Sequence, residues 1–564
     1  MRALVLIHRW LGIAFCLLFA MWFASGIVMH FVAFPALTDA ERVAGLAPVD
    51  STLARHTPAD AVKASGIDAT RVRLVARTDG LVYIVEGAAD IAAIHADALT
   101  RADIVSESAA LAIAVDHARR RGLTPGRAAF AGLASYDQWT VPNGLDPHRP
   151  LYRVALNDAA GTELYVSSRT GEVVRDTGRA ERAWNYAGSV VHWIYPTALR
   201  RNWRAWDMTV WTLSLAAFIG AMAGALLGVL RVRVSGRRAA SPFQGWHAWH
   251  HWLGLVSMTF VLTWISSGWL SMDHGRLFST GKPTRAEVSA VTGVPRWHDA
   301  AGRKGDAAAP DVREIEWFPL EGRIYRRERS GSASQQLFLA GEPAVPTRAF
   351  LRPDEVSAAA VHLAAGCRPA AAVEADDAYP VVPAMPGAPV YRAVCGGTWF
   401  HVDGASGAVL EKLDPSRRAY RWFYSALHVL DFPVLVSRPS WRTALIVVLC
   451  ALGFVFSSTG VVIGWRRLAS RAAAKRTHRN TQRCGMALAL NLLVPPIEET
   501  KMTTQDKEHG EGNYKASKEY NDATKKFVES GKVDEAAEKA KPKNQNEARE
   551  MKDAEEVGKS RAKP

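Results

Sequence analysis

The sequence is poor in cysteine, with five in 564 residues, and none of them forms a CxxC or CxxCH motif. Covalently attached c-type haem, which uses CxxCH, is therefore not expected. The sequence also lacks HExxH, a Walker A motif and a GxGxxG after a strand. We therefore expect no zinc-protease site, no nucleotide hydrolysis and no internal nicotinamide or flavin site. No nucleic-acid-binding motif is present, so the net charge of +14 calls for another explanation.

Charge is missing altogether from four long stretches, and each exceeds the ~20 residues that a helix needs to cross a bilayer. They lie between Arg9 and Asp39, between Asp207 and Arg231, between His251 and Asp273, and between Arg442 and Arg466. The first is too long for the apolar core of a signal peptide, and no convincing cleavage site ends it, so we interpret it as a retained helix. The sequence predicts an integral membrane α-helical protein with four transmembrane helices in contact with lipid.

Basic residues predict the orientation. The loop 231–241 and the segment 466–483 are rich in Arg and contain no acidic residue. By the positive-inside rule both face the cytoplasm, and the two long loops face outward. Five arginines on the outer flanks of the spans run against this rule: Arg200, Arg201, Arg204, Arg438 and Arg442. We expect a multi-pass protein of the bacterial inner membrane with its large loops in the periplasm, and topology explains the excess of arginine.

The chain repeats itself with an offset of about 240 residues. The matched positions are 8–12 with 250–254 (HRWLG and HHWLG), Trp22 with Trp264, Ser25-Gly26 with Ser267-Gly268, and, more loosely, His192 with His428. This pattern predicts two copies of one unit, each made of a helix, an outer domain and a second helix. Repeats of this kind place their binding site at the interface between the copies.

The outer loops have α+β character. Segment 106–122 predicts an amphipathic helix, and 151–156 and 163–175 predict strands closed by a turn at Thr170-Gly171. The corresponding helix and strands of the second loop are 353–366, 390–397 and 398–413, and earlier strand pairs are predicted at 71–87 and 312–329. Each loop is therefore expected to hold two helix-plus-antiparallel-sheet units. Cys367 and Cys395 both lie in the second loop, where an outward location permits a disulfide.

These units carry a resemblance. The helix–strand–turn–strand pattern that ends in GEVV (171–174) or GAVL (407–410) resembles the PepSY domain. The HRWLG start of the first helix, with a later histidine before the next helix, resembles the PepSY-associated transmembrane family over roughly residues 1–470. Four helices with two large outer loops are similar to its siderophore-iron reductase members, which hold two b-type haems. The resemblance implies two haem b cofactors and electron transfer to a periplasmic ferric siderophore, from a cytoplasmic-side donor that is a quinol or a reductase.

Histidines gather at both ends of the predicted bundle. The inner candidates are His8, His247, His250 and His251, and the outer candidates are His30, His192, His274 and His428. Haem iron takes axial imidazoles from facing helices, and two such ligands suit electron transfer. If the halves are related by a pseudo-two-fold axis, equivalent residues pair: His8 with His250 inside, and His192 with His428 outside.

Several alternatives stay open at this point. His30 lies ~33 Å from His8 on nearly the same helix face and is the second choice for the outer site, while His247 or His251 can replace His250. Trp22 and Trp264 are either packing residues or stepping-stones between haems. Arg200, Arg201, Arg204 and Arg442 either meet haem propionates or an anionic substrate, or are surface charges. A rival function is a haem-free, membrane-anchored PepSY module that binds a periplasmic protein or peptide.

The predicted segments are these: 1–35 (first helix), 36–182 (first PepSY-like domain), 183–232 (interfacial histidine segment and second helix), 233–245 (basic cytoplasmic loop), 246–274 (third helix), 275–416 (second PepSY-like domain), 417–467 (interfacial histidine segment and fourth helix), 468–501 (basic cytoplasmic segment) and 502–564 (charged tail). The tail lacks Trp, Leu and Ile. It cannot bury a core, so we expect it to be disordered.

Overall fold

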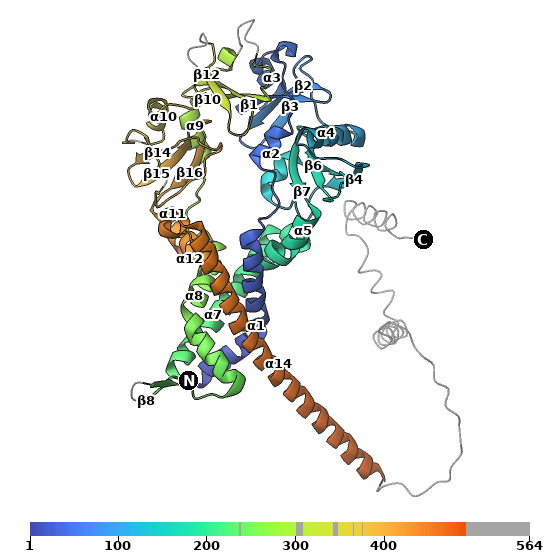
Figure 1. Cartoon of the computed structure of the whole chain (residues 1–564), viewed down its shortest axis with the longest axis vertical. Coiled ribbons are helices and arrows are strands. Elements are labelled where there is room, and N and C mark those ends of the chain that lie inside the picture. The colour runs from blue at the N-terminus through green and yellow to red at the C-terminus, as the bar shows by residue number, and fades with distance from the viewer. Residues whose placement is uncertain (236–237, 301–307, 342–347, 365, 375, 492–564) are drawn as a thin grey trace, which may run out of the picture. The chain divides into compact units, whose positions relative to one another are not determined.

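The computed structural model describes the chain except for residues 236–237, 301–307, 342–347, 365, 375 and 492–564 (Figure 1). The predictions for the tail 502–564 lie outside the described residues. Contacts divide the chain into two units, Met1–Thr477 and His478–Pro564. The first unit contains the features described below.

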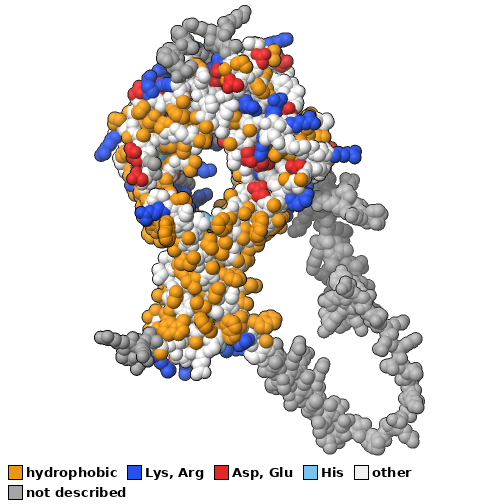
Figure 2. Space-filling view, in the orientation of Figure 1, with side chains coloured by type: hydrophobic (Ala, Val, Ile, Leu, Met, Phe, Trp, Pro, Cys, Tyr) orange, Lys and Arg blue, Asp and Glu red, His pale blue; other side chains and the backbone are white. Residues whose placement is uncertain are grey.

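Four helices are long and apolar enough to cross a membrane, as the charge-free stretches predict. They are α1 (Arg2–Phe31), α7 (Trp203–Leu230), α8 (Gly245–Ser271) and α14 (Pro439–Asn491), the last with its apolar part at Pro439–Arg471. Their outer faces are covered with hydrophobic side chains (Figure 2). Helix α1 packs against α7, and α7 packs against α8. A short hairpin, β8 (Arg233–Ser235) and β9 (Arg238–Ala240), joins α7 to α8. The prediction of four membrane helices is confirmed.

The fourth helix is longer than the sequence analysis expects. Segment 468–501 was predicted as a separate basic segment, but α14 runs without interruption through its first part to Asn491. The helix continues past the predicted span because loss of hydropathy ends a membrane span without ending a helix. Arg, Lys and Ala are good helix formers, and no proline or glycine interrupts 467–484.

The first outer segment folds into two groups of strands. Its elements are α2 (Asp39–Ala44), η1 (Ser51–Leu53), α3 (Pro58–Ser65), β1 (Ala69–Arg77), β2 (Gly80–Gly87), β3 (Ile91–His95), α4 (Glu107–Arg120), β4 (Ala129–Ala134), η2 (Asn143–His148), β5 (Leu151–Ala155), β6 (Glu163–Ser167), β7 (Val173–Thr177), α5 (Arg179–Asn185), η3 (Tyr186–Val190) and α6 (Thr197–Arg200).

The second outer segment has a similar order without counterparts of α2 and η1. Its elements are α9 (Arg285–Thr292), η4 (Trp297–Ala300), β10 (Glu314–Leu320), β11 (Arg323–Arg329), β12 (Gln335–Leu339), α10 (Pro353–Ala360), β13 (Ala371–Ala372), β14 (Val390–Cys395), β15 (Thr398–Asp403), β16 (Val409–Leu413), α11 (Pro415–Tyr420), η5 (Arg421–Ala426), α12 (Leu427–Val429) and α13 (Pro433–Val436). Helices α3 and α9 each start with a threonine capping box, Thr57 with Asp60 and Thr284 with Glu287.

One six-stranded sheet is built from both outer segments, in the order β12-β11-β10-β1-β2-β3. Strands β1 and β10 pair antiparallel at its centre, with Val72 opposite Trp317 and Leu74 opposite Ile315 (Figure 1). The sequence analysis treated the two segments as separate domains. The strand positions were predicted, but the pairing of β1 with β10 was not. The pattern of apolar residues identifies a strand, but it does not show which other strand lies beside it.

Each segment also has a four-stranded antiparallel sheet of its own. The first is β4-β5-β6-β7 and packs on α4, with Tyr152 and Leu164 in its core. The second is β13-β14-β15-β16 and packs on α10, with Tyr391 and Phe400 in its core. These elements match the predicted helix–strand–turn–strand units.

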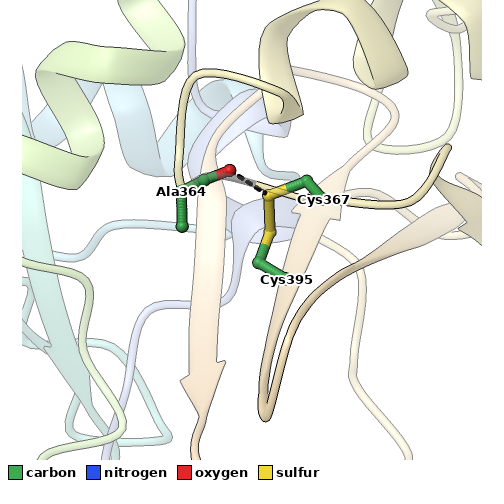
Figure 3. The surroundings of a disulfide bond; sticks show 3 residues. All are labelled: Ala364, Cys367 and Cys395. Carbon is green, nitrogen blue, oxygen red and sulfur yellow. Dashed lines mark hydrogen bonds between the residues drawn. A yellow bond between two sulfur atoms is a disulfide. The ribbon is translucent and has the colours of Figure 1, made fainter.

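A disulfide joins the end of β14 to the chain that follows α10 (Figure 3). It links Cys395 to Cys367, whose Sγ also lies 3.0 Å from the carbonyl oxygen of Ala364. The permitted disulfide of the second outer segment is thus present in the structure. Cys16 and Cys450, both in membrane helices, are free thiols.

Candidate functional site

Two histidines meet at the inner end of the helix bundle. The ring of His8 on α1 lies 6.2 Å from the ring of His250 on α8, measured between ring centres. Nδ1 of His8 lies 3.2 Å from the carbonyl oxygen of Gly220 on α7, and Nδ1 of His250 lies 2.8 Å from Oγ1 of Thr459 on α14. All four membrane helices therefore contribute to the position of this pair.

Two further histidines meet at the outer end. His192 follows the π-helical turn η3, and His428 follows the π-helical turn η5. The centres of their rings lie 6.3 Å apart. Nδ1 of His192 lies 3.0 Å from Oγ of Ser25 on α1, and Nδ1 of His428 lies 3.1 Å from Oγ of Ser267 on α8. Single π-helical turns inside helices occur frequently at functional sites.

Hydrogen bonds to carbonyl groups assign the proton on two of these rings. A carbonyl oxygen can only accept, so the Nδ1 that faces it must carry the hydrogen. This holds for His8, which faces the carbonyl of Gly220, and for His428, which also faces the carbonyl of Trp264 at 3.2 Å. In the neutral ring, Nε2 is then left with a free lone pair.

The hydroxyl partners lead to the same assignment for the other two rings. Oγ1 of Thr459 donates its single hydrogen to the carbonyl of Phe456 at 2.6 Å, so it can only accept from His250. Oγ of Ser25 donates to the carbonyl of Met21 at 2.7 Å, so it can only accept from His192. Among the described residues, no hydrogen bond engages Nε2 of any of these four histidines. Ligand histidines in metal sites characteristically donate their second ring nitrogen in this way.

A glycine faces each of the four rings, and at His8 and His428 no larger residue would fit without a shift of the ring or the helix. A Cβ atom on Gly224 would lie 2.5 Å from Cε1 of His8, and one on Gly460 would lie 3.5 Å from Cε1 of His250. At the outer pair the same atom on Gly26 would lie 3.7 Å from His192, and on Gly268 it would lie 3.1 Å from His428. Small residues allow the close approach of helices, and here they allow the approach of helix and imidazole.

A cavity of about 420 Å³ opens beside the inner pair. His8 and His250 both line it, together with apolar side chains of all four membrane helices and a row of glycines that includes Gly220, Gly224 and Gly460. Its volume falls within the range of cofactor sites, ~300–1,000 Å³, and such sites are mostly apolar with a few polar groups.

The spacing of both pairs fits a metal between them. A metal–imidazole bond is about 2.0 Å long, so two ligand nitrogens on opposite sides of one metal lie ~4 Å apart, and the ring centres lie ~6 Å apart. The observed separations are 6.2 Å and 6.3 Å. Among the described residues no group of three or more His, Cys, Asp and Glu side chains could hold a metal ion. Two imidazoles and an apolar cavity with flat glycine walls fit haem, which brings its own four nitrogen ligands.

The other predicted histidines have different surroundings. Nε2 of His30 is bonded to Oγ1 of Thr443 at 2.9 Å. Nδ1 of His274 pairs with Oδ2 of Asp207 at 2.6 Å. Both nitrogens of His251 are bonded, Nδ1 to Ser241 and Nε2 to the carbonyl of Gly228. His247 lines the inner cavity but does not reach the His8–His250 pair through any ring contact or hydrogen bond among the described residues.

Sequence reasoning missed the partners that orient the rings. Ser25 and Ser267 were identified from the sequence only as repeated positions, and Thr459 was not identified at all. The repeated Ser-Gly pair was the available signal, since each serine accepts from a histidine and each glycine faces the same ring. Trp22 and Trp264 also lie beside the outer pair: Nε1 of Trp22 donates to the carbonyl of His192 at 2.9 Å.

The four spanning helices and the sheet-containing outer segments define a multi-pass membrane protein with α+β parts. A model of the PepSY-associated TM region matches residues 5–467, and the chain belongs to this family. No curated protein matches the sequence closely enough to be called similar.

Proposed function

We propose that this protein is a di-haem b electron-transfer protein. It passes electrons from the cytoplasmic side of the membrane to a periplasmic acceptor, and the acceptor is the iron of a ferric siderophore, which becomes Fe(II). One observation carries the proposal: two pairs of histidines, at opposite ends of one helix bundle, each have ring centres just over 6 Å apart and unbonded Nε2 atoms.

The chain's own residues hold, orient and shield the groups. His8 and His250 are the ligands of the inner haem, and His192 and His428 are those of the outer haem. Haem would supply one-electron chemistry when bound, and holding it by two histidines at each site would favour electron transfer over oxygen chemistry. Gly220, Thr459, Ser25 and Ser267 orient the four rings and keep the hydrogen on Nδ1.

Aromatic side chains connect the two pairs through the bundle. His250 stacks on Phe456 at 4.9 Å between ring centres, and Phe456 packs against an apolar cluster that contains Phe23. Phe23 lies 6.0 Å from Trp264, whose carbonyl accepts from Nδ1 of His428. These contacts support a role for Trp264 as an intermediate between the haems, in addition to packing.

Matched contacts in the two halves support the internal repeat. The Ser-Gly pair on α1 holds His192, and the Ser-Gly pair on α8 holds His428, so each half positions one outer ligand by itself. Pairing of the ligands then occurs between the halves, where a repeat protein builds its site.

Two features support a periplasmic position of the outer segments. Disulfides persist in oxidising compartments such as the periplasm, and Cys367 and Cys395 form one. At the opposite end, Arg231 follows α7, and the hairpin β8–β9 carries Arg233 and Arg238, as expected for a cytoplasmic loop of an inner-membrane protein.

The rival function is a haem-free anchored module in which the outer segments bind a periplasmic protein or peptide. It leaves the four oriented Nε2 atoms and the inner cavity without a role. The test is the spectrum of the full chain purified in detergent. On reduction with dithionite we expect a sharp α-band of b-type haem and about two haems per chain. A colourless preparation would refute the reductase function and favour the rival.

Single-residue variants test the ligand assignment. His8→Ala and His250→Ala should each remove the same haem, and His192→Ala and His428→Ala should each remove the other, because one imidazole cannot hold the iron from both sides. His30→Ala is the matched control and should keep both haems, since Nε2 of His30 is bonded to Thr443. Loss of a haem in the control, or its retention in both variants of one pair, would contradict the assignment.

A further inference from the structure

Three arginines from different elements line the inner cavity together with His8 and His250. They are Arg9 on α1, Arg231 directly after α7, and Arg467 on α14. No acidic residue is among the lining residues, and within the described part of the chain none of the three arginines forms an ion pair. The cavity is therefore apolar along its walls and cationic at one end.

Arg467 carries the clearest sign of a missing partner. Its Nε atom is buried and has no hydrogen-bond partner among the described residues. A buried donor without a partner costs about 1–3 kcal/mol, and such groups call for a specific explanation. The positive-inside rule explains why arginines are numerous on this side of the membrane, but it does not explain why a half-buried arginine lines a cavity with its Nε atom unpaired among the described residues.

The neighbouring arginines of the same helix behave differently. The guanidinium group of Arg466 lies 5.8 Å from the ring centre of Trp246, and that of Arg471 lies 4.9 Å from the ring centre of Trp10. Neither lines the cavity. Arg466, the adjacent residue, is turned about 100° away from Arg467 around the helix. Arg471 lies one turn further along α14 and is held by Trp10.

We propose that Arg9, Arg231 and Arg467 form an anion site that binds the carboxylate groups of the haem held by His8 and His250. This inference rests on the proposed function. A porphyrin of the b type carries two carboxylates on one edge, and charged groups cannot remain in the apolar part of the bundle without a partner. The guanidinium fork matches a carboxylate in a bidentate manner, which distinguishes it from a general basic surface.

The site therefore selects the orientation of the haem as well as its identity. The carboxylate edge must face the cationic end of the cavity, and the apolar edge must face Phe456 and the interior of the bundle. Positive charge near the iron also favours the reduced state of the haem over the oxidised state, because reduction adds a negative charge. Removal of one arginine should lower the midpoint potential of the inner haem.

The experiment compares Arg467→Gln with Arg466→Gln in the full chain in detergent. In a His192→Ala background, which retains the inner haem alone, we expect Arg467→Gln to release haem to excess apomyoglobin about tenfold faster and to lower the midpoint potential. Arg466→Gln should behave as its parent. Arg9→Gln and Arg231→Gln should follow Arg467→Gln. In the unaltered background, retention of the outer haem reports that the variants are folded.

A second arm identifies the anion. The chain is produced without haem and loaded either with iron protoporphyrin or with its dimethyl ester, which lacks the carboxylates. The parent should hold the acid longer than the ester, and Arg467→Gln should make this difference smaller. Equal retention by the parent, with an effect of anionic lipid instead, would assign the arginines to a lipid phosphate and overturn the inference. Failure of the parent to bind any haem would refute the proposed function, which is a different result.

Discussion

The hydroxyl groups that face the outer histidines are not equivalent. Nδ1 of His192 has Ser25 as its acceptor, whereas Nδ1 of His428 has both Ser267 and the carbonyl of Trp264. Removal of one hydroxyl should therefore affect the two rings differently. This difference allows a test of the proposed ligands that does not remove them.

Ser25→Ala should leave the N–H of His192 without an acceptor and make Nε2 a poorer ligand. We expect loss of the outer haem to become at least about tenfold faster, the lower end of what altered outer partners of ligand histidines cause. Ser267→Ala should have a smaller effect because the carbonyl of Trp264 remains. Haem loss and the midpoint potential of the outer haem are the measurements.

The control for this pair is Ser266→Ala. Its hydroxyl donates to the carbonyl of Thr263 and does not contact a histidine ring. An equal effect of Ser266→Ala and Ser25→Ala would mean that the serines act through helix packing alone. A larger effect of Ser267→Ala than of Ser25→Ala would contradict the hydrogen-bond assignment.

The choice among His247, His250 and His251 illustrates what residue patterns can and cannot decide. The repeat favoured His250 as the partner of His8 because the two occupy equivalent positions, and the structure brings these two rings together. The sequence left the other two open, because three histidines within five residues cover much of the circumference of a helix. In the structure both ring nitrogens of His251 are bonded, to Ser241 and to the carbonyl of Gly228, and His247 has no ring contact or hydrogen bond to the His8–His250 pair among the described residues.

At the scale of elements, helix α7 lines the inner cavity with small residues. Gly220, Gly224 and Gly228 are spaced by one turn and all line the cavity. A Cβ atom on Gly224 would lie 2.5 Å from the ring of His8. A Cβ atom on Gly228 would lie 3.4 Å from the side chain of Leu255, which is flexible. A larger side chain therefore does not fit at Gly224, whereas Gly228 leaves ordinary contact distance for a methyl group.

Gly224→Ala should displace the ring of His8 and remove or weaken the inner haem, because an approach of 2.5 Å is far below van der Waals contact. The measurement is haem content per chain, with the outer haem as an internal reference. Gly228→Ala is the matched control on the same helix face and should keep both haems. If Gly224→Ala keeps the inner haem with an unchanged spectrum, the ring of His8 does not lie against Gly224 as it does in the structure.

The elements themselves were largely predictable. Charge-free stretches longer than ~20 residues identify spans because charge is costly in lipid, and alternating strands with glycine turns identify the outer sheets. Helix α14 extends beyond its predicted end because a helix continues wherever its backbone hydrogen bonds do, whether or not lipid surrounds it. The π-helical turns before His192 and His428 had no sequence signal that we could interpret.

At the scale of the whole molecule, a buried ion-pair network joins the sheets of the outer segments. Arg73 on β1 binds Glu172 of the β6–β7 turn through two bonds of 2.6 and 2.9 Å, and it also binds Glu86 on β2 and Glu314 on β10. Burial alone would raise the pKa of Glu86, but Arg71 and Arg73 outweigh it and hold that pKa at about 2. The pKa values of Glu172 and Glu314 are lowered for the same reason, chiefly by Arg73 and Arg42 against the effect of burial.

Carboxylates with a lowered pKa in the folded state stabilise it only while they are charged. This contribution is present above the ordinary glutamate pKa, near 4.5, and is lost as the pH falls toward about 2. Glu172→Gln should lower the free energy of unfolding at pH 7 by about 3 kcal/mol, because it leaves Arg73 partly unpaired. The difference from the parent should shrink as the pH falls below the ordinary glutamate pKa and through the lowered pKa of Glu172, since Glu172 then becomes protonated in the parent as well.

Thermal unfolding of the full chain in detergent, followed by circular dichroism at several pH values, measures this effect. Asp97→Asn is the control: Asp97 is exposed in the turn after β3, and its variant should match the parent at every pH. A difference between Glu172→Gln and the parent that does not change with pH would show that the packing of the Glu172 side chain, and not its charge, stabilises the turn. The second segment has Ala408 at the position that corresponds to Glu172 in the first. The ion pair made by Glu172 therefore has no equivalent in the second half.

The sequence alone determined which parts of this protein lie in lipid, where its helices and strands fall, and which histidines occupy equivalent positions. These properties follow from local physical chemistry: charge in lipid, the period of apolar side chains, and duplication of short motifs. Only the tertiary structure decided that β1 and β10 form one sheet, that serine, threonine and glycine orient the rings, and which Nε2 atoms are left unbonded. Those outcomes depend on side chains more than 150 residues apart, and no local pattern specifies which distant group will complete a hydrogen bond.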